Sequence, residues 1–331
     1  MRRREFIVML GGGAAGWPLA ARAQKTRTIG ILMNGAAGEQ VIQSNLNAFV
    51  QELRALGWVD GRNLRIEYRW NGGSRERAGS YAEELVKLAP DVILSASTTN
   101  LLALRRATSS IPVVFLQVSD PMAQGFVSSV THPGGNITGF SAYEFSIGGK
   151  WIELLKEVAP KLSRVAVMSN PATSPQTKLF QRAIESAGPK FGIEVVAAPV
   201  SNDTDIVHAI EALAKPQPGG LILPTDTYTR LRQGRIAELA IQSRVPTLSA
   251  STDFVEEGGL MFYGATTLEA LAAQFHQAAS YVDRILKGAK PGDLPIQGAS
   301  KFELAINRKT ATALGLEIPP KLLFTADRVI E

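Results

Sequence analysis

The chain repeats one pattern of apolar and polar positions, in which a short continuous apolar run precedes a stretch with apolar residues at helical spacing. The run 28–34 is typical of a parallel strand that is covered on both faces. Residues 40–56 then carry apolar side chains near helical spacing, and Gly57 ends the expected helix. The alternation predicts a parallel sheet with right-handed crossovers, with later strands at 64–70, 91–95 and 112–118 and later helices at 74–88 and from residue 98 or 99.

The pattern pauses at 132–141, which is rich in turn-forming residues, and then restarts as a second series of the same units. Residues 258–264 are expected to form a return crossing, and a helix with apolar residues on one side between Leu268 and Leu286 follows. The second series comprises expected helices at 144–158, 174–190, 203–214 and 230–243, expected strands at 164–169, 194–199, 220–224 and 246–248, and a tail at 301–330 with a short strand, a short helix and an extended end.

The whole pattern predicts an α/β protein of two doubly wound parallel-sheet (Rossmann-like) lobes joined by a multi-strand hinge. The length of 331 residues agrees, at about 150 residues per domain. We expect the N-terminal lobe to comprise 26–139 and about 264–293. The C-terminal lobe is expected to comprise 140–263 and about 298–331, with crossings near 138–142, 258–265 and 293–300.

The N-terminal residues have the features of an export signal. Residues 2–7 read R-R-R-E-F-I, an apolar run follows, and Ala21-Arg22-Ala23 has the form of a cleavage site. The apolar run, at about fifteen residues, is shorter than the roughly twenty needed to span a bilayer. The twin arginines are typical of the signal that exports folded proteins. We therefore expect a signal peptide at 1–23, cleavage after Ala23 and a periplasmic protein. A retained membrane anchor is the alternative.

Composition and charge exclude several classes of protein. The formal net charge is +5, and loss of four arginines and one glutamate with residues 1–23 lowers it to +2. A charge so near neutral gives little support to nucleic-acid binding. The absence of cysteine excludes disulfides, thiolate metal sites and thiol nucleophiles. His132, His208 and His276 are not spaced as a local metal pair, so we expect neither a metal nor a cofactor.

Candidate ligand-binding residues follow the expected strands, because ligands of open α/β sheets bind at the carboxyl ends of the strands. These residues carry small hydroxyl, amide or carboxylate groups, which suit a compact polar solute, and the adjacent helix N-termini favour an anion. The same residue types are preferred helix N-caps, so a capping role stays open for each. Asp120 and Asp226 are candidates to balance a ligand ammonium, and Tyr143 and Tyr263, beside two expected crossings, to cover its apolar part. The strand-end candidates are Asn34, Ser97, Thr98, Ser119, Asp120, Asn170, Asp226 and Ser249.

Several motifs, taken in order, resemble one protein family. They are S-D-P-M-A-Q-G-F-V at 119–127, P-G-G-N-I-T-G-F-S at 133–141, F-V-E-E-G-G-L-M-F-Y-G at 254–264, K-F-E-L-A-I-N-R-K-T-A at 301–311 and L-G-L-E-I-P-P at 314–320. With the signal, the chain resembles the ABC-transporter substrate-binding proteins of the tryptophan/tyrosine-binding type, which have the type I periplasmic binding protein fold. The resemblance implies that the loops at Asn34, 97–98, 119–120, Asn170 and Asp226, with Tyr263, form the site. Phe262 departs from the family pattern, in which a small residue often precedes the tyrosine.

The resemblance implies a binding module and not an enzyme: the periplasmic solute-binding component of an ABC importer. It would capture a small polar solute by hinge closure, either an amino acid, aromatic ones included, or another small carboxylate. Its partners would be that ligand, the membrane permease and the separate ATPase, because the chain has no P-loop of its own. Neither nucleic acid nor direct membrane contact is expected, and the protein is expected to be a monomer.

Two other functions stay open at this point. An exported hydrolase would need a nucleophile with its base, but the chain has no G-x-S-x-G motif and its histidines lie away from the expected strand ends. A ligand sensor that docks on a membrane receptor has the same sequence features as a transport receptor.

Overall fold

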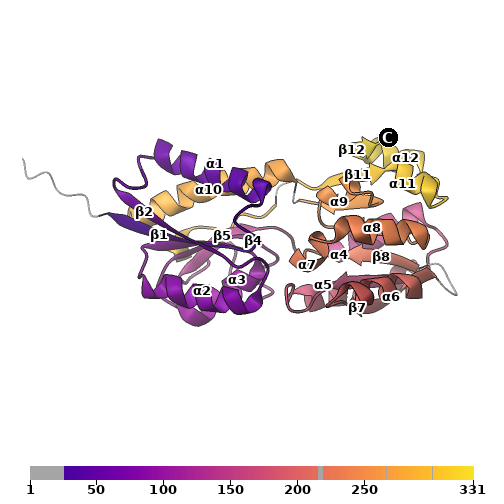
Figure 1. Cartoon of the computed structure of the whole chain (residues 1–331), viewed down its shortest axis with the longest axis horizontal. Coiled ribbons are helices and arrows are strands. Elements are labelled where there is room, and N and C mark those ends of the chain that lie inside the picture. Colours follow the sequence, from indigo (N-terminus) through magenta and orange to yellow (C-terminus); the bar gives the residue numbers. More distant parts are fainter. Residues whose placement is uncertain (1–25, 215–218, 266, 300) are drawn as a thin grey trace, which may run out of the picture.

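The computed structural model describes residues 26–214, 219–265, 267–299 and 301–331, which form two α/β lobes placed end to end (Figure 1). The expected signal peptide and its cleavage site lie outside the described residues. The described part of the N-terminal lobe contains a parallel sheet in the order β2-β1-β3-β4-β5. Its strands are β1 (Arg27–Met33), β2 (Leu64–Trp70), β3 (Val92–Ala96), β4 (Val113–Val118) and β5 (Ile137–Ser141).

Helices cover both faces of this sheet, which explains why its central strands are apolar throughout. On one face, α1 (Gln40–Ala55) packs against α10 (Leu268–Leu286), although more than 200 residues separate them. On the other face, α2 (Arg75–Lys87) packs against α3 (Thr98–Ala107). Figure 1 shows the two helix pairs above and below the sheet. The chain therefore returns to the N-terminal lobe late in the sequence to complete its core.

The C-terminal lobe contains a sheet in the order β12-β11-β10-β9-β8-β6-β7 among the described residues. The run β7-β6-β8-β9-β10 repeats the order of the first sheet, and only the β10–β11 pair is antiparallel. Both sheets therefore have the 2-1-3-4-5 order of flavodoxin-like folds, with a switch point beside the first strand. The strands are β6 (Arg164–Ser169), β7 (Glu194–Pro199), β8 (Gly219–Leu223), β9 (Thr247–Ser249), β10 (Met261–Gly264), β11 (Glu303–Asn307) and β12 (Arg328–Ile330).

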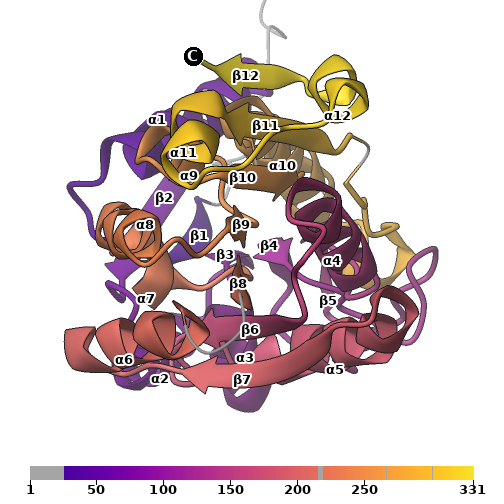
Figure 2. The same cartoon turned by 90° about the vertical axis from the view of Figure 1, so that its right-hand side faces the viewer.

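Helices also cover both faces of the second sheet, as Figure 2 shows. On one face, α4 (Ile147–Val158) and α5 (Thr177–Ala187) bury an aromatic cluster around Trp151 and Phe180. On the other, α6 (Asp203–Ala214) and α8 (Gln233–Gln242) bury Ile206, Ile210 and Ile236. The shorter helices are α7 (Thr227–Arg230), α9 (Asp253–Glu256), α11 (Arg308–Ala313) and α12 (Pro320–Thr325), with 3-10 turns η1 (Gly188–Phe191) and η2 (Pro291–Asp293).

The structure confirms the expected α/β class and corrects one element. Residues 258–264 were expected to be a crossing, but their second half is strand β10, which pairs with β9 and β11. Met261 and Phe262 are buried on its two faces. The run is short and preceded by two glycines, so its pattern does not separate a strand from a connection. Among the described residues, no helix is both long enough and apolar enough to cross a membrane.

The described chain passes between the lobes three times: after β5, after β10 and after η2. The first and third passages are joined by hydrogen bonds: Ser141 N donates to Gln297 O (2.8 Å), and Gln297 N donates to Gly139 O (3.0 Å). This pairing gives the lobes a multi-strand connection at one edge of the molecule.

Gly139 in this connection lies against the backbone of β4. Its φ is +152°, and an added Cβ would lie 2.1 Å from Phe115 O and 2.6 Å from Phe115 N. Only glycine fits at this position, because the clash is with backbone atoms that cannot move aside.

We expect Gly139→Ala to lower the free energy of unfolding by about 3 kcal/mol or more, since the backbones of β4 and β5 would have to separate. Gly135→Ala is the matched control, because its Cβ would meet no atom within 4 Å. Urea titrations of the two variants compare them. Equal stabilities would contradict the close approach.

Candidate functional site

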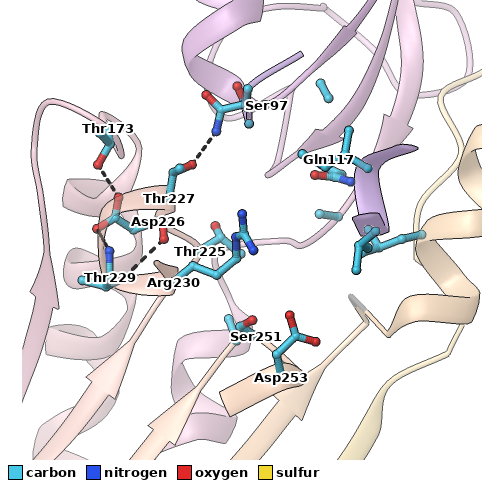
Figure 3. A pocket seen from close by; sticks show the side chains of 18 of the residues that line it. Ser97, Gln117, Thr173, Thr225, Asp226, Thr227, Thr229, Arg230, Ser251 and Asp253 are labelled. Atoms are coloured by element: carbon cyan, nitrogen blue, oxygen red, sulfur yellow. Dashed lines mark hydrogen bonds between the residues drawn. The ribbon is translucent and has the colours of Figure 1, made fainter. Parts of the chain in front are cut away.

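A cavity of about 200 Å³ lies between the two lobes, where the carboxyl ends of their strands face each other (Figure 3). The N-terminal lobe contributes the loops after β1 and β3, Gln117 near the end of β4, and parts of α1 and α10. The C-terminal lobe contributes the loops after β6, β8 and β9 and the helices α7 and α9. The polar residues that line it include Asn34, Glu39, Ser97, Thr98, Gln117, Gln176, Thr225, Asp226, Thr227, Arg230, Gln233, Ser249, Ser251 and Asp253.

The loop after β3 has a strained backbone at Ser97. Its φ is +92°, an unusual value for a residue other than glycine, and its hydroxyl caps α3 by accepting from Asn100 N (3.3 Å). The buried Asn100 amide holds this loop in place by donating to Leu32 O (3.1 Å) and Ala96 O (2.9 Å). The amides of Thr98 and Thr99 begin α3, so no intrahelical carbonyl accepts from them. The unusual backbone conformation of Ser97 therefore places the N-terminus of α3 at the cavity.

Gln117 reaches the cavity through an irregularity in β4. The pairing of β4 with β5 shifts register between Phe115 and Val118, and Gln117 has a φ of +57°. A bulge of this kind re-aims a side chain that a regular strand would direct elsewhere. Figure 3 shows the Gln117 amide directed into the open space from the N-terminal lobe.

The carboxylate of Asp226 organises the opposite wall. It accepts hydrogen bonds from the backbone N–H groups of Asn170 (2.9 Å), Tyr228 (3.1 Å) and Thr229 (3.3 Å). The Thr173 hydroxyl is a fourth donor. Asp226 caps α7 and also ties the loop after β6 to the loop after β8. These four donors favour the capping role over the binding of a ligand ammonium.

Among the described residues, polar contacts join the lobes around the cavity at three places. The Asn34 amide donates to the Thr227 hydroxyl, and the Thr99 hydroxyl donates to Thr173 O (3.1 Å). The third contact is an ion pair between Arg230 and Glu39 (2.9 Å). These contacts involve loops and helix ends, so separating the lobes would break no strand pairing of either sheet.

The cavity has an apolar wall formed by two helices of the N-terminal lobe, whereas its polar lining groups come from both lobes. On the N-terminal side, α1 and α10 contribute Val41, Ile42, Leu268, Leu271 and Phe275. Val41 and Leu268 are exposed at 43% and 49%, which is high for large apolar side chains. Exposed apolar side chains at the edge of a cleft indicate contact with a ligand or partner.

Several buried polar atoms in the cavity lining, from both lobes, have no hydrogen-bond partner among the described residues. Unpaired buried polar atoms are rare in folded proteins, so a group of them in one cavity indicates a place where a polar solute binds. The atoms that line this cavity are Thr98 Oγ1, Gln176 Oε1, Thr225 Oγ1 and Gln233 Oε1.

A model of the family described as ABC transporter substrate binding protein matches residues 40–330. The chain belongs to this family. The Tyrosine-binding protein of Clostridioides difficile (strain R20291) is 28% identical to this substrate-binding protein over 269 residues, which cover 81% of this chain and 76% of that protein.

Solved structures have the same two-lobed fold. A conserved domain protein from Vibrio cholerae O1 superposes with a TM-score of 0.80 at 28% identity, covering 92% of this chain and 100% of that one. An ABC domain from Streptococcus pneumoniae, in complex with L-Trp, superposes with a TM-score of 0.77 at 23% identity, with the same coverage. The type I periplasmic binding protein fold that the resemblance implied is confirmed.

Of the candidates from the sequence, Asn34, Ser97, Thr98, Asp226 and Ser249 line the cavity of this substrate-binding protein. The other strand-end candidates do not line it. The Asp120 carboxylate accepts from Ala123 N (2.9 Å) in a turn, and Asn170 Oδ1 accepts from Ala172 N (2.8 Å). Ser119 is buried beside Asp120.

The two tyrosine candidates also lie outside the cavity lining. Tyr143 is 1% exposed and its hydroxyl donates to Ala250 O (2.8 Å), so its ring belongs to the core. Tyr263 stacks on Phe302 with ring centroids 5.9 Å apart. Phe262 lies on the opposite face of β10, packed on Val255. Phe275 on α10 is in the cavity lining, but it is as buried as Tyr143 and packs in the core of the N-terminal lobe.

Lining residues that the sequence did not indicate include Glu39, Arg230 and Asp253. Arg230 and Asp253 follow strands by several residues, and they reach the cavity because α7 and α9 are short. No histidine lines the cavity as described, and the described residues contain no group of three or more His, Cys, Asp or Glu placed to hold a metal ion.

We expect Asp226→Ala to lower the free energy of unfolding of the ligand-free protein by about 2–3 kcal/mol, because it removes a helix cap and leaves buried N–H groups unpaired. Asp253→Ala is the control from the same cavity, since Asp253 makes no side-chain hydrogen bond within the described residues. Chemical denaturation without ligand measures both. Unchanged stability of Asp226→Ala would show that its hydrogen bonds are dispensable.

Proposed function

We propose that this protein is the periplasmic solute-binding component of an ABC importer that captures an amino acid with an apolar or aromatic side chain. The observation that carries this proposal is the combination of an apolar wall, formed by α1 and α10 of the N-terminal lobe, with polar lining groups from both lobes. An amphipathic solute such as an aromatic amino acid would satisfy both at once.

Binding by hinge closure is supported by the way in which the lobes meet. Each lobe has its own sheet and core, and the lobes contact each other around the cavity through Asn34, Thr99 and the Arg230–Glu39 pair. A solute that touches both lobes stabilises the closed arrangement, because in the open arrangement it contacts only one lobe. Closure would then display the loaded state to a permease, and a separate ATPase would supply the energy.

The names of the relatives support an amino acid as the solute. One curated relative is a tyrosine-binding protein, and one solved relative was crystallised with L-Trp. The apolar wall with Val41, Leu268 and Leu271 suits the side chain of such a ligand. The unpaired polar atoms of Thr98, Thr225 and Gln176 suit its polar end. We further infer that the protein is a monomer without a cofactor.

The hydrolase alternative has no support from the geometry, because the cavity hydroxyls have no histidine beside them in the part of the chain that is described. A sensor for a membrane receptor would use the same cavity. Stimulation of the reconstituted permease ATPase by the loaded protein would favour transport over sensing.

Calorimetric titration of the purified protein tests the proposed ligand class. We expect L-tyrosine, L-tryptophan or L-phenylalanine to bind and to raise the melting temperature by mass action, with L-serine and L-aspartate much weaker. Absence of binding by all the aromatic amino acids and by L-leucine would contradict the proposal.

Leu271→Asn tests the apolar wall. We expect about tenfold or greater loss of affinity for an aromatic amino acid, since an apolar contact is replaced by a polar amide. Leu231→Asn is the control, because Leu231 is 57% exposed and lies outside the cavity lining. Equal affinities of the two variants would remove α10 from the binding site.

A further inference from the structure

We propose that the C-terminal lobe binds both charged groups of a zwitterionic amino acid, with the carboxylate on Arg230 and the ammonium on Asp253. The ligand side chain would then face the apolar wall of the N-terminal lobe. This inference rests on the proposed function and adds to it the ionic partners and the orientation of the solute.

Arg230 has free capacity to bind a carboxylate. Figure 3 shows its guanidinium in the open space between the lobes. One terminal nitrogen pairs with Glu39 (2.9 Å), and the side chain has no other hydrogen bond or ion pair within the described residues. The remaining N–H groups include a second edge of the guanidinium fork, which matches the two oxygens of a carboxylate.

Asp253 is a carboxylate of the cavity that has neither a hydrogen-bond donor nor a cationic side chain as a partner among the described residues. It begins α9, lines the cavity, and makes no side-chain hydrogen bond or ion pair among residues that the structure describes. Figure 3 shows its oxygens turned toward the space in which Arg230 lies. Asp226, by contrast, already accepts four hydrogen bonds. A ligand ammonium would therefore be drawn to Asp253.

The charges also give the orientation of the ligand. Arg230 and Asp253 both belong to the C-terminal lobe, whereas the charged residue that lines the cavity from the N-terminal lobe is Glu39. Glu39 repels a carboxylate and is occupied by Arg230 and by Ala36 N (2.8 Å). The charged head of the solute would bind the C-terminal lobe first, and closure would bring Leu268 and Leu271 against its side chain.

Ligand analogues that lack one charge at a time test this assignment. The probes are L-tyrosine, L-tyrosinamide without the carboxylate, and 3-(4-hydroxyphenyl)propanoate without the ammonium, together with the corresponding tryptophan series. We expect the protein to bind each analogue about 10- to 100-fold more weakly than the amino acid, the range expected for a hydrogen bond between charged groups.

Arg230→Gln should lose the preference for the amino acid over its amide and keep the preference over the deaminated acid. Asp253→Asn should show the opposite pattern. Each variant is checked for folding by its melting temperature without ligand, and the discrimination ratio is read within one variant, so a general loss of affinity does not affect it.

Matched controls separate the assigned roles from neighbouring charges. Arg232→Gln removes an arginine that pairs with Asp203 outside the cavity, and Glu256→Gln removes a carboxylate of α9 that pairs with Arg328. Glu39→Gln breaks the ion pair between the lobes but leaves the guanidinium in place. Arg232→Gln and Glu256→Gln should keep both preferences. Glu39→Gln should keep the preference for the carboxylate or increase it, because it removes a negative charge from the cavity.

Unchanged preferences in Arg230→Gln and Asp253→Asn would overturn the assignment while the proposed function stands. Loss of the carboxylate preference in Glu39→Gln would also overturn it, because the ion pair between the lobes would then explain the effect of Arg230. Failure of the unaltered protein to bind any amino acid would instead reject the proposed function itself.

Discussion

The site depends on one geometric constraint: in both lobes, the parallel strands end at the gap between the lobes. Both sheets have the order 2-1-3-4-5, so each has a switch point at the carboxyl ends of its first and third strands. The two switch points face each other, and Asn34 contacts Thr227 across them. The cavity is thus an interface between two separately packed cores. Its walls can part by a rotation of whole lobes, with no loss of strand pairing in either sheet.

Each lobe holds its wall in place with one buried polar side chain. Asn100 ties the ends of β1 and β3 to α3, and Asp226 ties the loops after β6 and β8 to α7. The hydrogen bonds of these two side chains are made with other groups of the protein. Arg230 and Asp253, which are less buried, keep unused donors and acceptors at the cavity. Rigidity and binding capacity are therefore assigned to different residues, and a substitution affects one without necessarily affecting the other.

The repeated apolar pattern was sufficient to predict the fold, since the expected strands at 64–70, 164–169 and 194–199 have the bounds of β2, β6 and β7. Strand ends also led to all five candidates that line the cavity, because parallel topology alone brings them together. Arg230 and Asp253 could not be found in this way, since each follows its strand by several residues. Tyr143 was expected in the site from its nearness to a crossing, but ring packing on Trp151 decides its place. Phe275 has the same helical spacing as core residues, which hides its position at the cavity.

The hydrogen bonds between the first and third crossings restrict how the molecule can move. Two extended segments are joined through Gly139, Ser141 and Gln297, so in the proposed closure this connection would be the axis about which one lobe rotates. Ala142, which follows β5, lies at the cavity close to this axis. Such a rotation changes the distance between the lobes little near its axis and greatly at the opposite side of the cavity. The protein would therefore discriminate strongly between solutes whose size differs at the end that lies beside Ala142. A difference in size at the opposite side of the cavity would be accommodated by a small change in the angle between the lobes.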